Sequence, residues 1–325
     1  MKFGIKIGLV LLLNFCSMII HAQNESPLQP FSNSLLINPA FAGLDNQTKV
    51  HVGNQYYNID TAQAYNLLFV TYNTYSDKLK GGVGIIFQQG VIGKRNISTT
   101  ELGFAYSGFP KKTENGNIRF GLNANMLLAR KQMFVRMLDR VMIDPDLRPN
   151  PPGAESLRYF MFKPRFSFLW DTHTVRWGLT AGIPLKFDLA EDAEETEDAF
   201  PANATLYIAR NQEGYKNGLR TKPYVFVPEL MVFYQEDFFL SRFHAYMKHT
   251  TNTLGAYIQS DFTNNIHTMG GTFGIAQGNF RLNLSAGAGI PGISDEIGFT
   301  GELTLQLVVP RTDYSKINPW ATRKK

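Results

Sequence analysis

Histidine, cysteine and clustered carboxylates are the residues with the greatest capacity for chemistry, and their spacing limits what this chain does. Apart from His21 near the N-terminus, the histidines are dispersed, and no H-E-x-x-H or paired-cysteine spacing gathers ligands for a metal; they are His51, His173, His244, His249 and His267. The sequence also lacks G-x-S-x-G, which would present a serine nucleophile, and the phosphate-holding G-x-x-x-x-G-K-[ST]. We therefore predict no catalytic residues, no cofactor, no metal site and no enzyme.

The densest charge is an acidic run between Asp188 and Asp198. Carboxylates suit hard cations such as calcium, so this run is a candidate contact for calcium or for a protein partner on an outer surface. Like charges also repel one another and keep a segment solvated, which makes a plain surface loop the alternative interpretation. The sequence leaves both open.

The first 22 residues are typical of a secretory signal peptide. Lys2 and Lys6 precede an apolar stretch from Ile7 to Ile20, which is shorter than the ~20 residues that a membrane-spanning helix needs. Cleavage after Ala22 removes Cys16, so the mature chain has no disulfide and no thiol chemistry. The formal net charge of +5 includes two lysines of this leader and is spread along the chain, which argues against a nucleic-acid partner.

The elements that must position any site are predicted by a period of two in hydrophobicity. From Val175 to Phe187 the odd positions are apolar, while the even ones are Arg, Gly, Thr, Pro or Lys. The segments 117–126 and 280–290 alternate in the same way, as β-strands do and helices do not. Soluble strands average ~5–6 residues and tilted membrane strands need ~9–11, so the lengths favour a membrane barrel.

Candidate strands of this kind recur along the whole mature chain and alternate Gly, Asn, Ser and Thr with apolar residues, as expected of a wet lumen and a lipid face. They lie at 49–58, 65–75, 82–89, 99–107, 117–130, 159–169, 175–187, 203–210, 223–234, 238–248, 254–260, 267–276, 280–288 and 298–309. We predict an all-β, transmembrane antiparallel β-barrel of about 14 strands, an even number as bacterial barrels require.

Aromatic residues and prolines refine this prediction. Tyr and Phe recur near the predicted strand ends, where they would form the two interfacial girdles of a barrel. Pro164, Pro184 and Pro228 fall inside predicted strands and each removes a ladder donor, so we expect bulges or rim positions there. The long connection 131–158 is either a folded surface element, an inward plug or an ordinary outer loop.

One motif follows the leader and precedes the first strand. It reads Leu35-Leu36-Ile37-Asn38-Pro39-Ala40-Phe41-Ala42-Gly43 and resembles the opening motif of the PorP/SprF family, in which an Asn-Pro-Ala-aromatic-Ala-Gly sequence comes before the barrel. The stretch Leu254 to Ile258, followed by Asp261 and Gly270-Gly271, is similar to the late strands of that family.

The resemblance implies a component of the type IX secretion and gliding machinery in the outer membrane. Its partners would be the translocon, outer-membrane lipid and a secreted cargo protein, which it exports or attaches by binding the cargo's C-terminal signal domain. The expected domains are a signal peptide at 1–22, a periplasmic segment with the motif at 23–48, a barrel at 49–310 and a tail at 311–325.

The motif itself has two interpretations that the sequence weighs equally. Asn38 and Pro39 favour a turn and Gly43 allows a positive φ, so with Phe41 the segment packs as a small plug or collar at the periplasmic mouth. The same surface is a candidate partner-binding site, made of Asn38, Pro39, Ala40, Phe41, Ala42 and Gly43.

Two other functions compete with the secretion partner. A passive porin or hydrophobic-solute channel would have an open conduit, and an outer-membrane hydrolase would bring Ser, His and Asp together in space without a local signature. Conductance would identify the first and turnover of phospholipids or peptides the second.

Overall fold

The computed structural model describes residues 28–30, 32–44, 47–58, 65–92, 97–113, 116–131, 157–172, 174–188, 202–210, 224–236, 238–249, 251–294 and 298–309. These residues form one antiparallel sheet and two short 3₁₀ turns, η1 (Ser34–Leu36) and η2 (Pro39–Phe41). Among them, no helix is long and apolar enough to cross a membrane. The long connection 132–156 and most of the acidic run, from 189 to 198, lie outside the described residues.

The strands match the segments predicted by alternation, most of them to within two residues at each end. They are β1 (Thr48–Asn58), β2 (Tyr65–Ser76), β3 (Gly81–Ile92), β4 (Ile97–Thr113), β5 (Gly116–Lys131), β6 (Leu157–Thr172), β7 (Val175–Gly182), β8 (Leu185–Asp188), β9 (Asn203–Arg210), β10 (Val225–Gln235), β11 (Phe238–Lys248), β12 (Asn252–Asp261), β13 (Ile266–Gln277), β14 (Phe280–Gly289) and β15 (Phe299–Val309).

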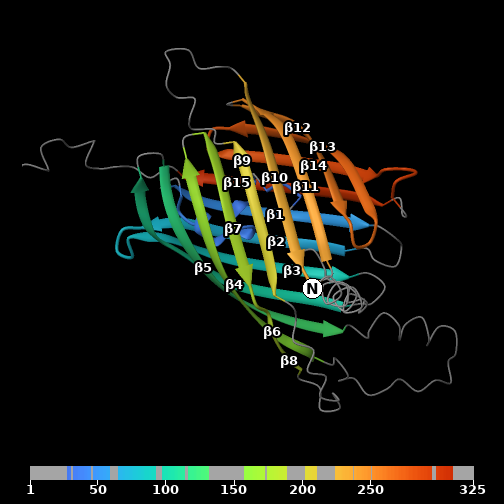
Figure 1. Cartoon of the computed structure of the whole chain (residues 1–325), viewed down its shortest axis with the longest axis horizontal. Coiled ribbons are helices and arrows are strands. Elements are labelled where there is room, and N and C mark those ends of the chain that lie inside the picture. The colour runs from blue at the N-terminus through green and yellow to red at the C-terminus, as the bar shows by residue number, and fades with distance from the viewer. Residues whose placement is uncertain are drawn as a thin grey trace, which may run out of the picture.

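The sheet closes on itself. With β8 left aside, strands adjacent in sequence pair antiparallel, and β1 pairs with β15, so the ring has no open end (Figure 1). β7 and β8 both pair with β6 in the same register and are two halves of one barrel stave. The structure therefore confirms the predicted antiparallel barrel with 14 strands around it, β8 being the extra element.

The division of β7 from β8 has a chemical cause. Pro184 has no backbone N–H, so it cannot continue the ladder with β6. Ile183 still donates its N–H to the carbonyl of Pro164 at 3.3 Å, which keeps the two halves aligned. Pro228 lies at the end of the β9 ladder, whose last pair is Glu229 with Ala209. The expectation was a bulge or a rim position. The registers through Pro164 and Pro228 remain unshifted, so neither forms a bulge, and Pro164 in the middle of β6 meets neither expectation.

The outer face is apolar across neighbouring strands, because alternate residues of adjacent strands lie side by side in register. One continuous row of paired and exposed side chains crosses six strands from β15 to β10: Leu303, Leu284, Phe273, Leu254, Met247 and Phe226. Exposure of so large an apolar surface is unfavourable in water and favourable in lipid. Exposed aromatic residues also stand near the strand ends, as the girdle prediction required: Tyr56, Tyr234, Phe239 and Phe299.

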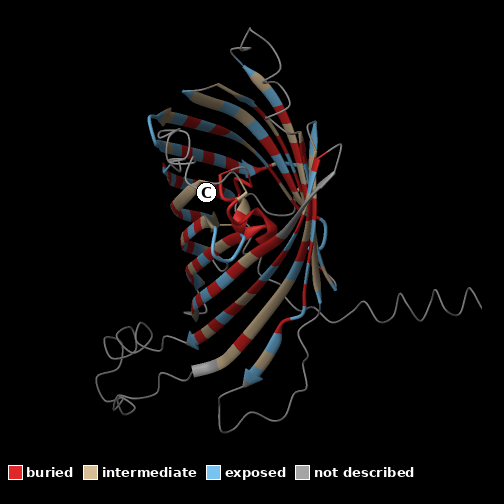
Figure 2. Ribbon diagram, turned by 90° about the vertical axis from the view of Figure 1, so that its left-hand side faces the viewer, coloured by how far each residue is buried: buried red, intermediate tan, exposed pale blue. Residues whose placement is uncertain are grey.

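The inner face is filled. Residues 28–30 and 32–44 lie inside the barrel and not beneath it, and their buried ribbon lies among the strands in Figure 2. We call the segment 28–44, so far as the structure describes it, the plug. The near mouth is the barrel end at which β1 begins at Thr48, and the far mouth is the opposite end. Of the plug and collar anticipated from the sequence, the structure contains a plug.

Candidate functional site

The plug is a chain of turns whose geometry follows from its sequence. Asn38 caps η2 by accepting the N–H of Ala40 at 2.8 Å, and Pro39 occupies the first helical position, where a missing N–H costs nothing. Gly43 has a φ of +58°, a conformation that is strained for any residue with a Cβ. The Asn-Pro-Ala-Phe-Ala-Gly motif thus encodes a compact turn that ends just before β1.

Glycines of the barrel wall allow the plug backbone to approach the strand backbone directly. A Cβ on Gly82 of β3 would overlap the carbonyl oxygen of Ala42, and one on Gly121 of β5 would overlap the backbone of Pro39 and Ala40. These positions require glycine because any side chain would occupy the space that the plug fills. We call the lumenal face of β2 to β7 the plug wall.

Side chains of the plug wall donate hydrogen bonds to the plug's main chain. Four consecutive strands each supply one donor to one plug carbonyl: Ser107 to Ala40 at 3.0 Å, Arg119 to Ala42 at 3.0 Å, Arg165 to Leu36 at 3.3 Å and Thr180 to Ile37 at 3.1 Å. The Oγ of Ser167 also accepts the N–H of Ala40 at 3.1 Å. Buried carbonyls are costly when left unpaired, so these donors stabilise the plug where it lies.

Asn38 reverses the direction of donation, because here the plug donates hydrogen bonds and the wall accepts them. Its amide Nδ2 donates to the carbonyl of Phe168 at 3.0 Å and, more weakly, to that of Leu179 at 3.5 Å. Gly178 leaves room for this amide, since a Cβ there would lie 2.6 Å from Nδ2. Asn38 therefore links β6 and β7 to the plug while its Oδ1 caps η2.

Two apolar clusters anchor the plug. Ile37, Ala40 and Phe41 pack with Leu169, Tyr207, Ala209, Met231, Phe238 and Leu240, and the rings of Phe41 and Tyr207 meet edge to face at 5.5 Å. Leu35, Leu36 and Ala42 pack with Phe69, Ile86 and Ala105. Burial of one such large side chain stabilises by about 1.5–3 kcal/mol and a neutral hydrogen bond by about 1, so the apolar contacts dominate the plug's affinity and the polar ones set its position.

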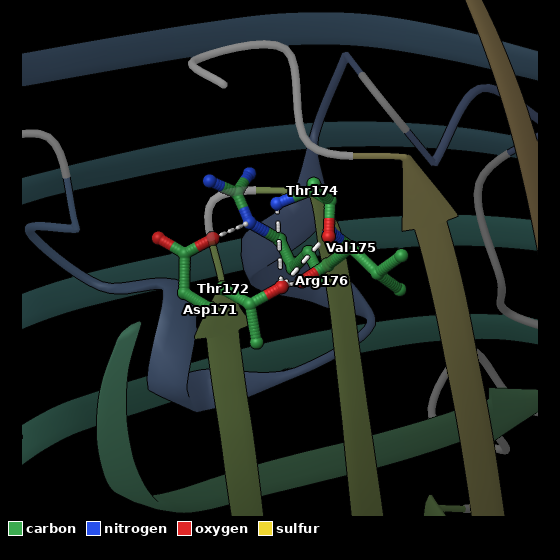
Figure 3. Close-up of polar contacts among 5 residues, drawn as sticks. All are labelled: Asp171, Thr172, Thr174, Val175 and Arg176. Carbon is green, nitrogen blue, oxygen red and sulfur yellow. Dashed lines mark hydrogen bonds and ion pairs between the residues drawn. The ribbon is translucent and has the colours of Figure 1, made fainter. Parts of the chain in front are cut away.

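Polar contacts hold the β6–β7 turn together at the near mouth (Figure 3). Arg176 forms an ion pair with Asp171 at 2.8 Å, and Thr172 accepts the N–H of Val175 at 2.9 Å. The guanidinium of Arg176 lies 5.6 Å from the ring centroid of Phe41, within the range of a cation–π contact. The turn and the motif aromatic are therefore in direct contact.

The opposite side of the lumen is filled mainly by large polar side chains, although Met231, Phe238 and Leu240 at its near edge belong to the apolar cluster that packs on the plug. We call the lumenal face of β10 to β15 the polar wall. Arg242 is fully buried there and donates to the Oε1 of Gln259 from Nε at 3.0 Å and from Nη2 at 2.6 Å. Arg242 also interacts electrostatically with Glu302 and Glu229. A buried guanidinium needs such partners, because isolated charges are expelled from low-dielectric surroundings.

The polar wall also contacts the first described residues of the plug. Glu302 accepts the N–H of Leu28, and its carbonyl accepts the side-chain amide of Gln29 at 3.2 Å. Hydroxyls complete the wall: Tyr257 bonds Thr300 at 2.8 Å, and Thr272 lies between His244 and Ser285. The plug therefore extends from Glu302 on the polar wall to the near mouth.

A third polar group lies on β4 to β6. Glu101 is buried, forms an ion pair with Lys163 at 2.9 Å and accepts a hydrogen bond from Asn125. This pairing neutralises a carboxylate that faces the interior.

The predicted partner-binding residues are thus brought together as one unit. Asn38, Pro39, Ala40, Phe41 and Ala42 are all buried in the lumen, and Gly43 packs against β2 and β3. Sequence reasoning missed the residues that receive them, among them Ser107, Arg119 and Thr180. The available signal was their place on the polar face of the alternation, which marks them as lumenal without saying what they contact.

The other candidates for chemistry do not converge. His51 is buried against Thr71 at 3.0 Å, and His244, His249 and His267 lie on separate strands or turns. Within the described ranges, no group of three or more His, Cys, Asp or Glu residues is placed to hold a metal. His173 and the acidic residues 189–198 fall outside those ranges.

Comparison with known proteins defines the class. The family model described as type IX secretion system membrane protein PorP/SprF matches residues 20–307, which is most of the chain. The chain belongs to this family, as the opening motif predicted. It is an outer-membrane β-barrel component of the type IX secretion system. A search of curated proteins gave no significant match.

Solved structures that match this chain's fold include outer-membrane proteins. Omp33 from Acinetobacter baumannii has 9% identity and a TM-score of 0.46, covering 82% of this chain and 99% of that one. A deletion mutant of the monoaromatic hydrocarbon channel TodX has 10% identity and a TM-score of 0.48, covering 86% and 94%. CdiB from A. baumannii has 8% identity and a TM-score of 0.45, covering 81% and 60%. At these scores the similarity carries no argument about function.

Proposed function

We propose that this barrel supports the export or surface attachment of one particular partner protein by binding that protein's C-terminal signal domain, while remaining associated with the translocon. Family membership supplies the secretion context. The observation that carries the proposal further is the filled lumen: the plug and the polar wall occupy the interior of the described barrel. A filled barrel suits an anchor for a folded domain better than a route for free diffusion.

The proposal also concerns where the partner binds. Asn38 to Gly43 are buried and bonded to the plug wall, so they contact a partner only if the plug leaves the wall or the partner enters the lumen. The mouths of the barrel are reached without either change. We therefore place the cargo contact at a mouth, with the motif shaping that mouth from within through Phe41 and the β6–β7 turn.

A pulldown tests the proposal directly. The full barrel is purified in mild detergent and the proteins that accompany it are identified. We expect one large secreted protein with a C-terminal signal domain, together with translocon components. Deletion of the gene followed by surface proteomics gives the second arm, in which that same protein should vanish from the surface. Normal display of every type IX cargo would refute the proposal.

The channel and hydrolase alternatives are separated by two measurements on the same preparation. A passive channel predicts steady single-channel conductance by the intact protein, whereas we expect none because the plug is in place. We also propose that the protein has no catalytic role, which is supported by the lack of local catalytic motifs. Turnover of phospholipids or peptides by the purified barrel, lost on mutation of a lumenal Ser or His, would overturn that.

A further inference from the structure

The plug is bound by the barrel wall in the way that a receptor binds a peptide. Its carbonyls at Leu36, Ile37, Ala40 and Ala42 each accept a side-chain hydrogen bond from a different strand. Main-chain recognition of this kind does not depend on the ligand's side chains, so it sets the ligand's position without selecting a sequence. All four donors belong to the barrel and none to the plug.

Selectivity comes from a few positions of the plug. Ala40 and Ala42 are fully buried where the wall leaves no space, so only small residues fit. Asn38 bonds two wall carbonyls, while Leu35 and Phe41 fill separate apolar clusters. Figure 2 shows the segment in the interior, with strands on its left and right. The complementary ligand is a short peptide with an Asn-Pro turn, small residues on both sides of an aromatic, and a glycine.

The covalent connection contributes little to this fit. The plug is joined to the barrel through the short stretch between Leu44 and Thr48, and the contacts that hold it lie on β2 to β7, on β9 to β11 and at Glu302. A tether raises the effective concentration of a ligand without adding contacts. The wall therefore retains its complementarity when the tether is cut.

We infer that the lumenal face of β2 to β7 is a peptide-binding site whose resident ligand is residues 28–44, and that the site binds the same peptide in trans after the covalent link is broken. The inference concerns the lumen alone and stands independently of the cargo proposal. Its ligand class is a peptide main chain with an Asn-Pro turn, held by carbonyl-directed donors over glycine sockets.

The experiment uses the full chain with a protease site inserted between Leu44 and Gln47. The barrel is folded in detergent, cleaved, and exposed to a synthetic peptide of residues 28–44 that carries a fluorophore. We expect cleaved barrel to exchange its resident segment for labelled peptide in a saturable manner, with competition by unlabelled peptide. Uncleaved barrel should take up no label, because the tethered plug outcompetes free peptide.

Matched variants give the inference its sharpest test. Gly121→Val should weaken uptake by about tenfold or more, since its side chain overlaps the plug backbone. Gly271→Ala is the control, because its Cβ would face outward with only the Gly255 carbonyl oxygen nearby, at 3.8 Å. A peptide with Asn38→Ala should bind about tenfold more weakly, and a scrambled peptide should not bind.

Two results would overturn the inference. One is cleaved barrel that remains folded and takes up no label even after its resident segment has dissociated. The other is equal uptake by the Gly121→Val barrel, which would place the peptide elsewhere. If Gly121→Val fails to fold, Gly178→Ala replaces it, because its smaller Cβ would press on the Asn38 amide and on nothing larger than a leucine methyl and a carbonyl.

Discussion

The plug wall and the polar wall face the same lumen but fill it by different means. On the plug wall, glycines at 82 and 121 withdraw to admit another stretch of backbone, and small or charged donors bond its carbonyls. On the polar wall, Arg242 bonds Gln259 and Tyr257 bonds Thr300, so the buried side chains are paired within the wall itself. The plug wall is shaped to bind another segment of chain, whereas the side chains of the polar wall bond mainly to one another.

This difference predicts different consequences of mutation. A change on the polar wall breaks contacts within the barrel and should destabilise the barrel as a whole. A change on the plug wall should release the plug and leave the barrel folded. Heat-modifiable migration on gels reports the first outcome, and protease sensitivity of residues 28–44 together with ion conductance reports the second.

Arg242→Ala should have the largest effect. Removing the guanidinium leaves Gln259 and the neighbouring carboxylates without their cation in a buried setting, which costs about 3–5 kcal/mol. We expect the temperature of barrel unfolding on gels to fall while the plug stays protected until the barrel melts. Arg242→Lys, which keeps the charge but not the paired donors, should fall between the variant and the parent. Unchanged melting would contradict the polar wall as a self-supporting network.

Gly82→Val should have the second largest effect, and the property that it changes is the binding of the plug and not the stability of the barrel. Its side chain would overlap the carbonyl of Ala42, and overpacking of this kind costs about 1–3 kcal/mol. The plug should become protease-sensitive and the barrel should conduct ions, with little change in the melting of the strands. Gly271→Ala on the outer face serves as the matched control and should leave both readouts unaltered. A protected plug in Gly82→Val would show that the wall does not need glycine there.

Asn38→Ala should weaken the plug by about 1–3 kcal/mol, because the carbonyl of Phe168 loses its amide donor and η2 loses its cap. Asn38→Asp separates the two roles, since an aspartate keeps the cap and lacks the donor. The aspartate also places an unpaired, buried carboxylate against the Phe168 carbonyl oxygen, so proteolysis rates should rank parent, Ala variant and Asp variant in increasing order. Equal rates for the Asp variant and the parent would assign the whole effect to the cap.

Phe41→Leu should have the smallest effect, about 1 kcal/mol, because leucine keeps most of the burial and loses only the ring contacts with Tyr207 and Arg176. Arg176→Gln in the same background should add little if the cation–π contact is already absent. A double-mutant cycle on plug protection measures this coupling, and full additivity would mean that the turn and the aromatic act separately.

The sequence predicted the strands well because each strand has one face toward lipid and one toward the lumen, so apolar and polar side chains alternate along it. Val175 to Phe187 alternates in this way without a break. The motif predicted the family. The sequence also indicated that Pro184 would interrupt a strand, and the structure divides β7 from β8 at that residue. The sequence did not predict what the lumen holds. The alternation puts Gly121 on the lumenal face of its strand, but it does not show that the missing side chain admits the plug.

The sequence also did not predict that the plug lies inside the lumen. Ser107, Ser167 and Thr180 all read as ordinary residues of a wet lumen, since a hydroxyl that bonds water and one that bonds a buried backbone have the same place in the alternation. Pairings across more than a hundred residues of chain, such as Asn38 with Phe168, depend on barrel closure and leave no local trace.

The position of residues 28–44 inside the closed barrel can be measured by cysteine crosslinking, since the mature chain expected after signal cleavage contains no other cysteine. Asn33 and Thr71 lie in side-chain contact, with Thr71 Oγ1 donating to Asn33 Oδ1 at 3.1 Å, so Asn33→Cys with Thr71→Cys should join through a short bis-thiol reagent in the folded protein. Asn33→Cys with the outward Val52→Cys should not join. Equal crosslinking of the two pairs, or crosslinking to Val52 alone, would contradict a plug that fills the lumen.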